Sequence, residues 1–470
     1  MTQPISITHE GGICYEDTYN HSLNFFSKAG SLFTKKGSFY GGEASALDLF
    51  KPAWIADNIT AFKLLLWLRD ARGGAGNRSA FRTCLRWVAE QFPEWVYANL
   101  SWIPMVGRWD DLRTLFSTDV GSEAAKLWVH AIRHEDILAA KWADRSDKLL
   151  QGALNLNEAN LRRLLASIRK NSIVEHKMCT KDWSSIEYKK VPSVAMARYT
   201  KAFGRNDAER FAEYKAALEK GETKVNAGAL FPHDCVRTVK NGDSTIADAQ
   251  FEALPNYMEN SGERAVVICD TSGSMATAVS GSIQAVDISQ ALALYCSLKI
   301  GKDSPFYKKF IAFCSEGEFK SWENMTFSQA VKNKTIFNGA VGSTRIDKAL
   351  DLILSSALHW NVKQENMPTA LIIVSDMQFS QGGVSGGEKQ LTEVQKCLSK
   401  WSAAGYNIPK IIYWNTAGYA GSVETKYGKN IALVSGFSPS ILKAIFEGDD
   451  LTPEGVMRAA IKKYGINIPA

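Results

Sequence analysis

The 470-residue sequence lacks the features that mark several large classes of protein. No apolar run approaches the 18 residues of a membrane-spanning helix, and the first residues do not follow the basic-then-apolar pattern of a secretory signal. None of the eight cysteines is paired as C-x-x-C, and the seven histidines have no H-E-x-x-H spacing. Neither a zinc cluster nor a disulfide framework is therefore expected. We expect a soluble, cytoplasmic protein.

Motifs of the common enzyme classes are also missing. There is no G-x-x-x-x-G-K-[ST] phosphate loop, and Ser272 stands two residues after Asp270, where an aspartyl phosphotransfer site commonly places a second aspartate. Gly383–Gly387 matches G-x-S-x-G, but no strand ends before it and no histidine follows it, because His359 is the last one. The Ser…Asp…His order of the α/β-hydrolases is thus excluded. We interpret this segment as a flexible loop and predict no enzymatic activity.

The sequence contains enough apolar residues for more than one domain. Apolar residues make up 45% of the chain and charged residues 22%, as in soluble globular proteins, and the net charge is only +6. The pattern of residues divides the chain into an irregular N-terminal arm (1–50), an array of packed helix pairs (51–220), a polar connector (221–262) and a C-terminal domain (263–470). The helical array predicts a helical-repeat, HEAT-like domain, although no clean sequence repeat is present.

The C-terminal domain alternates between two patterns. Short continuous apolar runs suit strands that are buried on both faces, and helical segments separate them. The predicted strands are 265–269, 310–314, 370–375, 410–415 and 431–435, and the predicted helices are 283–300, 345–359, 388–404 and 438–447. This alternation predicts a doubly wound, Rossmann-like α/β domain with a parallel sheet. Its ligands should lie where the strands end.

Oxygen-bearing side chains gather at these predicted strand ends. Asp270, Ser272 and Ser274 follow the first strand, Thr344 lies in a Gly-rich loop before a helix, and Asp376 ends the strand ALIIVSD. Two carboxylates and three hydroxyls are hard donors that suit Mg²⁺ and, less specifically, Mn²⁺ or Ca²⁺. The alternative is structural, with Asp270 and Ser272 only capping the helix that follows.

Basic residues are concentrated in two stretches of the helical part. Residues 151–205 carry 11 basic and 4 acidic residues, and residues 61–90 carry 6 and 2. Aromatic residues lie among them, and this combination suits a phosphate backbone with stacked bases. The candidate RNA-binding residues are Arg72, Arg78, Arg162, Arg163, Arg169, Lys170, Lys189 and Lys190. Charge alone favours the alternative of solvated helix faces with the aromatics (Trp183, Tyr188, Tyr199 and Phe203) in the core.

DTSGSM, the threonine of GST and the aspartate of SDM together resemble the metal-ion-dependent adhesion site (MIDAS) of von Willebrand factor type A (vWA) domains. The resemblance implies that Asp270, Ser272, Ser274 and Thr344 line a Mg²⁺ ion, with Asp376 acting through water. It also implies a protein partner that offers an acidic side chain to the ion. One departure is Met377, which stands where many members of that family have glycine.

Helices followed by such a domain resemble the Ro/TROVE ribonucleoproteins, whose helical repeats form a ring that binds RNA. LLWLRDARGGAGNRSAFR, IPMVGRWDDL, WSSIEYKKVPSVAM and VSGFSPSILKAIFEG resemble a poorly characterised Ro-like family with the same C-terminal domain, over about residues 50–450. The resemblance implies a non-enzymatic RNA-binding protein. The alternative is a metal-dependent interaction or structural component of an oligomer or particle, without RNA.

Overall fold

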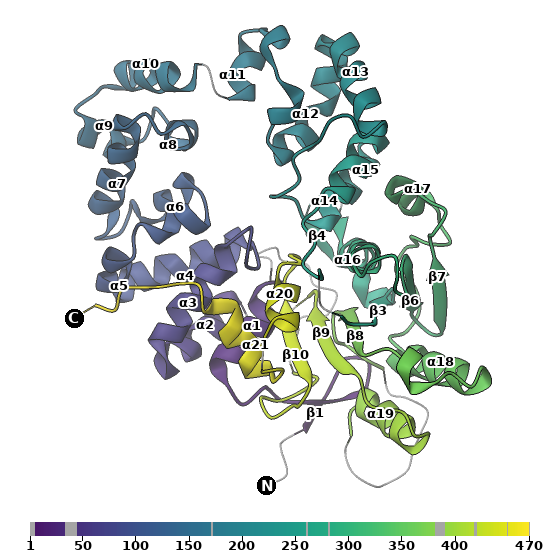
Figure 1. Ribbon diagram of the computed structural model, residues 1–470. Coiled ribbons are helices and arrows are strands. Elements are labelled where there is room, and N and C mark those ends of the chain that lie inside the picture. The colour runs from purple at the N-terminus through teal and green to yellow at the C-terminus, as the bar shows by residue number, and fades with distance from the viewer. Residues whose placement is uncertain are drawn as a thin grey trace.

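The computed structural model describes residues 5–32, 45–170, 173–259, 262–280, 283–380, 391–417, 421–448 and 450–469. A helical part is followed by a mostly parallel six-stranded sheet that helices flank (Figure 1). This arrangement confirms the predicted fold class. In the described ranges, no helix has both the length and the apolar character needed to cross a membrane.

The sheet has the order β10-β9-β8-β3-β6-β7, and only β7 runs antiparallel to its neighbour. Its strands are β3 (Ala265–Asp270), β6 (Lys309–Phe313), β7 (Gly317–Ser321), β8 (Ala370–Ser375), β9 (Lys410–Asn415) and β10 (Ile431–Ser435). Every residue of β3 and β8 is buried, which explains why these strands are continuous apolar runs. All five predicted strands are present, and β7 is an edge strand that we did not predict.

Helices cover this sheet. They are α16 (Ala285–Lys299), α18 (Ile346–His359), α19 (Glu393–Ala403), α20 (Ile441–Phe446) and α21 (Pro453–Ile461). Helix α16 packs against β3, β6 and β8, whereas α18 packs against β6 and β7. Helix α16 is buried almost all round, so its sequence is apolar on every side.

The prediction of an irregular arm over residues 1–50 is wrong for the residues described there. They form β1 (Ile5–Ile7), β2 (Ile13–Tyr15) and α1 (His21–Ala29), and α2 begins at residue 46. Helix α1 is capped by Asn20, whose Oδ1 accepts from the amide of Leu23 at 3.0 Å. It packs against β10, so the first residues of the chain belong to the α/β part. The two strands are too short to show a periodic pattern.

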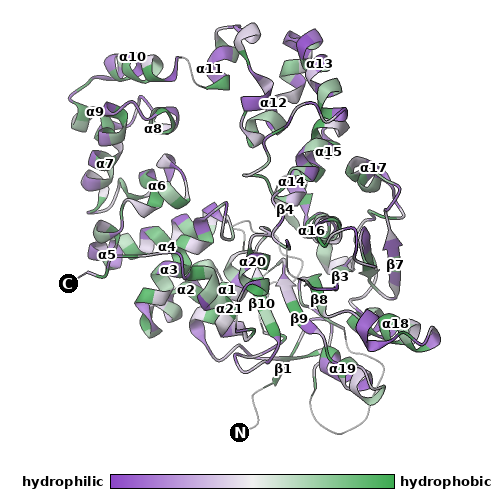
Figure 2. Cartoon of the chain, viewed as in Figure 1, coloured by the Kyte–Doolittle hydropathy of each residue, from purple (hydrophilic) through white to green (hydrophobic). Residues whose placement is uncertain are grey.

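The helical part forms an arc whose two ends are attached to the α/β part (Figure 1). Its helices are α2 (Ala46–Ala56), α3 (Asn58–Arg69), α4 (Arg78–Gln91), α5 (Pro93–Ala98), α6 (Trp102–Val106), α7 (Gly121–Arg133), α8 (Ile137–Trp142), α9 (Lys148–Leu154), α10 (Glu158–Arg169), α11 (Val174–Cys179), α12 (Ser193–Asn206), α13 (Ala208–Glu219), α14 (Pro232–Lys240) and α15 (Ser244–Glu252). The 3₁₀ turns η1 (Trp109–Leu115), η2 (Trp183–Ser185) and η3 (Tyr188–Lys190) join some of them. The chain leaves the α/β part at the contact of α1 with α2 and returns at the contact of α14 with α16. Most of these helices carry both polar and apolar positions (Figure 2).

The connector predicted over 221–262 is wrong in part, because it contains α14 and α15. Both helices begin with ordinary start signals, Pro232 in the first turn of α14 and Asp243 as the cap of α15. In the predicted helical array, the stretch over residues 121–142 is divided into α7 and α8. Glu135 separates them with φ +58°, a conformation that ends a helix.

The arc contains two hydrophobic cores. The core of α2–α10 is continuous with that of the sheet, whereas a second core is built from residues between Val174 and Ile246. Lys141 on α8 and Glu175 on α11 join the two units by an ion pair of 2.7 Å. The arc is therefore two packed units that meet between α10 and α11.

Candidate metal centre and candidate RNA surface

The predicted metal residues meet at the carboxyl edge of the sheet. Strand β3 lies between β6 and β8. After β3 the chain first adds β6 and β7 on one side, and then adds β8, β9 and β10 on the other side. The edge above β3 and β8 is thus the point where the strand order reverses, which is where open α/β sheets bind ligands. Asp270 ends β3, and Asp376 directly follows β8.

Backbone hydrogen bonds bring the Thr344 loop to the same place. The amide of Gly273 donates to the carbonyl of Gly342 at 2.9 Å, and the amide of Val341 donates to the carbonyl of Thr271 at 2.8 Å. Gly342 has φ +72°, which a residue with a side chain rarely adopts. These contacts fix the Gly-rich loop against the turn that carries Ser272 and Ser274.

The five side chains form one buried cluster of oxygens. Asp270, Ser272, Ser274, Thr344 and Asp376 are all buried. The Oδ1 of Asp270 accepts from the amide of Ser272 at 2.8 Å, and the hydroxyls of Ser272 and Ser274 lie 3.2 Å apart. Ser272 precedes the 3₁₀ turn η4 (Gly273–Ala276) without a side-chain capping bond. Helix capping therefore does not explain these residues.

Two atoms of this cluster, Thr344 Oγ1 and Asp376 Oδ2, are buried and have no hydrogen-bond partner among the described residues. Such atoms are costly unless a further group satisfies them. Both are hard oxygen donors, so the residues present fit a divalent cation. Within the described residues, no three His, Cys, Asp or Glu side chains gather as a metal cluster, and this centre differs by having two carboxylates and three hydroxyls.

The electrostatics of the cluster also favour a bound cation. Burial, and then the charge of Asp376, raise the pKa of Asp270. Burial also raises the pKa of Asp376, and the charge of Glu10 adds to this effect. Two buried carboxylates this close resist being ionised together, and a bound cation would relieve that repulsion.

Met377, the residue that departs from the vWA pattern, has φ +65°. This is the left-handed region that favours glycine, so the local backbone keeps the conformation that a glycine would supply. Its side chain is buried, and Met377 lines a small cavity beside Asp376.

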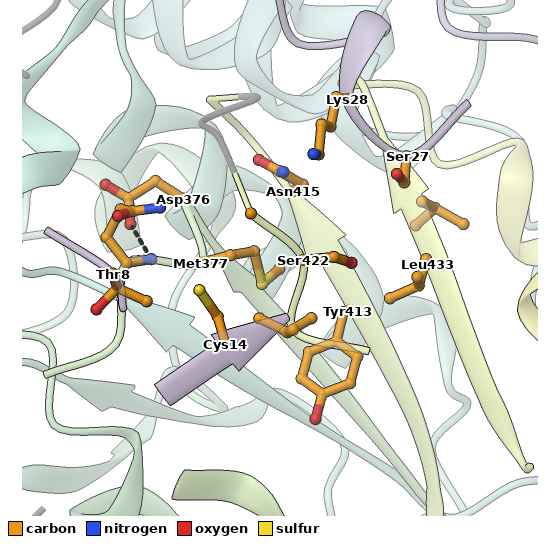
Figure 3. A pocket seen from close by; sticks show the side chains of 14 residues that line it. Thr8, Cys14, Ser27, Lys28, Asp376, Met377, Tyr413, Asn415, Ser422 and Leu433 are labelled. Carbon is orange, nitrogen blue, oxygen red and sulfur yellow. Dashed lines mark hydrogen bonds between the residues drawn. The ribbon is translucent and has the colours of Figure 1, made fainter. Parts of the chain in front are cut away.

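That cavity has a volume of about 20 Å³. Its lining includes Thr8, Lys28, Asp376 and Asn415, with Thr8 and Asp376 toward one end and Lys28 toward another (Figure 3). Lys28 is buried, and burial lowers its pKa. A cavity of this size has room for about one water molecule.

The sequence did not point to three residues that border this cluster. The Ser375 hydroxyl donates to Asp270 Oδ2. The Ser380 hydroxyl accepts from the Thr344 amide at 3.0 Å and donates to Glu10 Oε2 at 3.0 Å. The sequence could have indicated Ser375, because it is a polar residue next to Asp376 at the end of a predicted strand. Nothing in the sequence indicates Glu10, because it lies 370 positions from its partner Ser380.

The candidate RNA-binding residues lie on three separate parts of the arc. Arg72 and Arg78 flank the turn between α3 and α4, three residues lie on α10 and one directly after it, and two lie on η3. The side chains that are exposed and form no hydrogen bond or ion pair with a described residue are those of Arg72, Arg78, Arg162, Lys170 and Lys189. Arg163 contacts Asn160, and Lys190 pairs with Glu187.

Arg169 does not fit the RNA-binding set. Its guanidinium donates to the carbonyls of Ala140 and Ala143 at the end of α8, the second at 2.9 Å. Arg169 thus satisfies helix-end carbonyls. Tyr188 and Phe203 are likewise buried in the second core, so they cannot stack on bases. For these residues the structural interpretation is the right one.

Two protein-family models match the chain. The model described as "Domain of unknown function (DUF2828)" matches residues 8–117 and 131–268, which is more than half of the chain. The chain belongs to the DUF2828 family. A second model, described as "Domain of unknown function (DUF7788)", matches residues 264–463. In this DUF2828 protein the boundary between the two matches falls at the start of β3.

One relative of this DUF2828 protein is an uncharacterised protein, L728, of Acanthamoeba polyphaga mimivirus. It is 24% identical over 526 aligned residues, which cover 98% of this chain and 88% of the relative. Among solved structures, the Ro (RSR) protein of Deinococcus radiodurans aligns over 94% of this chain and 99% of its own, with 14% identity and a TM-score of 0.36.

Proposed function

We propose that the α/β part is a non-enzymatic, Mg²⁺-dependent binding module for a protein partner with an exposed acidic side chain. The observation that carries this proposal is the pair of buried, unpartnered oxygens, Thr344 Oγ1 and Asp376 Oδ2, beside Asp270. Asp270, Ser272, Ser274 and Thr344 would hold the ion, with Asp376 acting directly or through water. Mn²⁺ and Ca²⁺ are less specific alternatives.

The chemistry of the ion favours binding a partner. Mg²⁺ takes six oxygen ligands and readily keeps waters, so ligands from the protein leave a coordination position for an incoming carboxylate. Binding of an acidic partner is therefore a better match to this centre than catalysis.

Affinity purification in Mg²⁺ and in EDTA tests this function. The wild-type protein should retain its partner in Mg²⁺ and release it in EDTA, and Asp270→Ala should retain nothing in either buffer. Glu16→Gln, which removes an exposed negative charge away from the centre, is the matched control and should behave as wild type. A partner held equally by Asp270→Ala would contradict the proposal.

A second proposed function is RNA binding by the helical arc. The supporting observation is the set of exposed basic side chains, on α10 and beside the α3–α4 turn, that pair with no acidic side chain of the described residues. Phosphates would be bound by such a surface mainly through charge.

Nuclease treatment of the purified protein separates the two functions. RNA binding predicts nucleic acid that co-purifies, absorbs at 260 nm and is released by ribonuclease. A structural or assembly component without RNA predicts protein that is free of nucleic acid and enters a defined oligomer or particle.

A further inference from the structure

The N-terminal hairpin is docked on the loop that follows Asp376. The Thr8 hydroxyl donates to the carbonyl of Phe379 at 2.7 Å, and the His9 amide donates to Gln378 Oε1 at 3.0 Å. The Gly12 amide donates to the same Phe379 carbonyl at 3.2 Å. A side chain at Gly12 would collide with that carbonyl, so glycine allows the close approach.

The tip of this hairpin places the carboxylate of Glu10 against Ser380, beside Thr344. Ser380 donates its hydroxyl to Glu10 Oε2 at 3.0 Å, and the same hydroxyl accepts from the Thr344 amide at 3.0 Å. The Ser380 amide also donates to the Thr344 carbonyl at 2.8 Å. Glu10 is thus one hydroxyl away from the backbone of a residue whose own Oγ1 is unpartnered. Thr8, two residues before it, lines the cavity beside Asp376 (Figure 3).

We propose that Glu10 is an outer carboxylate of the metal centre, acting through Ser380, and that a bound divalent ion fastens the N-terminal hairpin to the sheet. This inference rests on the proposed Mg²⁺ function. Asp270 accepts from a backbone amide and from the Ser375 hydroxyl, both neutral. Burial raises the pKa of Asp376, and the negative charge of Glu10 adds to this effect, so Glu10 lies near enough to act on the centre. An ion attracts the Glu10 carboxylate and, with it, residues 5–15.

Binding of the ion and docking of the hairpin should strengthen each other. If docking of the hairpin strengthens the binding of the ion, the ion must strengthen docking of the hairpin by the same factor. The hairpin has no hydrophobic core of its own, because β1 and β2 are three residues each. Its position depends on the contacts with Phe379, Gln378 and Ser380, and on the pairing of Tyr15 with Ser422.

Hydrogen exchange combined with calorimetry tests the inference on the full chain. In wild type, saturating Mg²⁺ should slow exchange of the amides in residues 5–15 by about tenfold. Glu10→Gln should lose that slowing and weaken Mg²⁺ binding about tenfold, the effect typical of removing an outer group of a metal site. Glu16→Gln is the matched control in the segment directly after β2, and it should keep both properties.

The outcomes distinguish this inference from the function on which it rests. If wild type binds Mg²⁺ and Glu10→Gln binds it equally well with the same slowing of exchange, the role of Glu10 is wrong and the metal centre stands. If wild type binds no Mg²⁺ at millimolar concentration, the metal centre itself is wrong. Equal melting temperatures of wild type and Glu10→Gln without Mg²⁺ exclude a folding defect as the cause.

Discussion

Lys463 Nζ lies 2.6 Å from Asp70 Oδ2, and this ion pair joins the end of the chain to a turn of the helical part. The Tyr464 hydroxyl donates to the same oxygen at 2.9 Å, and the Asn467 amide donates to Asn99 Oδ1 at 2.8 Å. The first residues of the chain lie on the sheet, whereas the last residues lie on the helices. The two parts are thereby interlocked through the chain ends.

The first prediction concerns Asp70. Burial alone would raise its pKa, but hydrogen bonds and charge from Lys463, with the amides of Gly73 and Arg72, hold the pKa below its usual range. The stabilisation is therefore present above the unfolded pKa of about 3.9 and is lost as the pH falls through the lower folded pKa. Asp70→Asn should cost about 1.5–3 kcal/mol of unfolding free energy at pH 7 and less at pH 3. Urea unfolding at both pH values measures this, and an equal cost at both would contradict it.

The second prediction concerns a buried charge network under the turn of η1. Asp111 is fully buried and accepts from Arg69 Nε and Arg82 Nε, each at 2.7 Å. Asp111→Ala should destabilise the protein by about 3–5 kcal/mol, because it leaves the buried Arg69 without a counter-charge. Glu90→Ala, which breaks the exposed pair with Arg86, should cost less than about 1 kcal/mol. Similar losses for the two variants in urea unfolding would show that the network is not a stabilising feature.

The third prediction links pH to the metal. Asp270 and Asp376 have raised folded pKa values, so the folded protein holds their protons more tightly than the unfolded chain. Without a divalent ion, their contribution to stability is greatest below the unfolded pKa of about 3.9 and is lost as the pH rises through the folded values. Mg²⁺ competes with those protons, so its stabilisation should grow between pH 5 and pH 8. At 100 times its dissociation constant the stabilisation is about 2.7 kcal/mol. Thermal unfolding with and without Mg²⁺ checks this, and equal stabilisation at both pH values would count against it.

Much of the α/β part could be predicted because burial leaves a simple pattern. Strands such as β3 and β8 are apolar throughout since both faces are covered. Strand β7 has no such run, because it lies at the edge of the sheet, and its Phe319 is 51% exposed. The helices α14 and α15 escape prediction because their polar sequence resembles a connector, although Pro232 and Asp243 mark where they begin.

The residues of the candidate site could be predicted only where an oxygen-bearing side chain lies next to a strand end. Asp270 ends β3 and Asp376 follows β8, and the topology makes these strands neighbours, so the approach of the two carboxylates could be inferred. Glu10 could not, because it reaches the site from a hairpin 370 positions from Ser380. Charge counts also could not separate Arg162, which faces solvent, from Arg169, which binds the carbonyls that end α8.

The fourth prediction concerns the basic surface of α10. Reversing Arg162, Arg163 and Lys170 to glutamate should weaken RNA binding and lower the slope of log K against log salt by about 0.7 for each phosphate that the protein no longer neutralises. Arg169 is left unchanged in this variant, because its guanidinium holds the end of α8. Filter binding of single-stranded RNA at several salt concentrations measures both quantities. Unchanged affinity and slope in the folded triple variant would remove α10 from the RNA surface.

The central claim is that Asp270, Ser272, Ser274, Thr344 and Asp376 together bind one divalent ion. Calorimetric titration of Mg²⁺ into wild type, Ser272→Ala and Asp270→Ala tests it most directly. We expect one ion per chain in wild type, weaker binding in Ser272→Ala, which loses a neutral hydroxyl, and none in Asp270→Ala, which keeps its fold. Equal binding by wild type and Asp270→Ala, or no binding by wild type at millimolar Mg²⁺, would contradict the account.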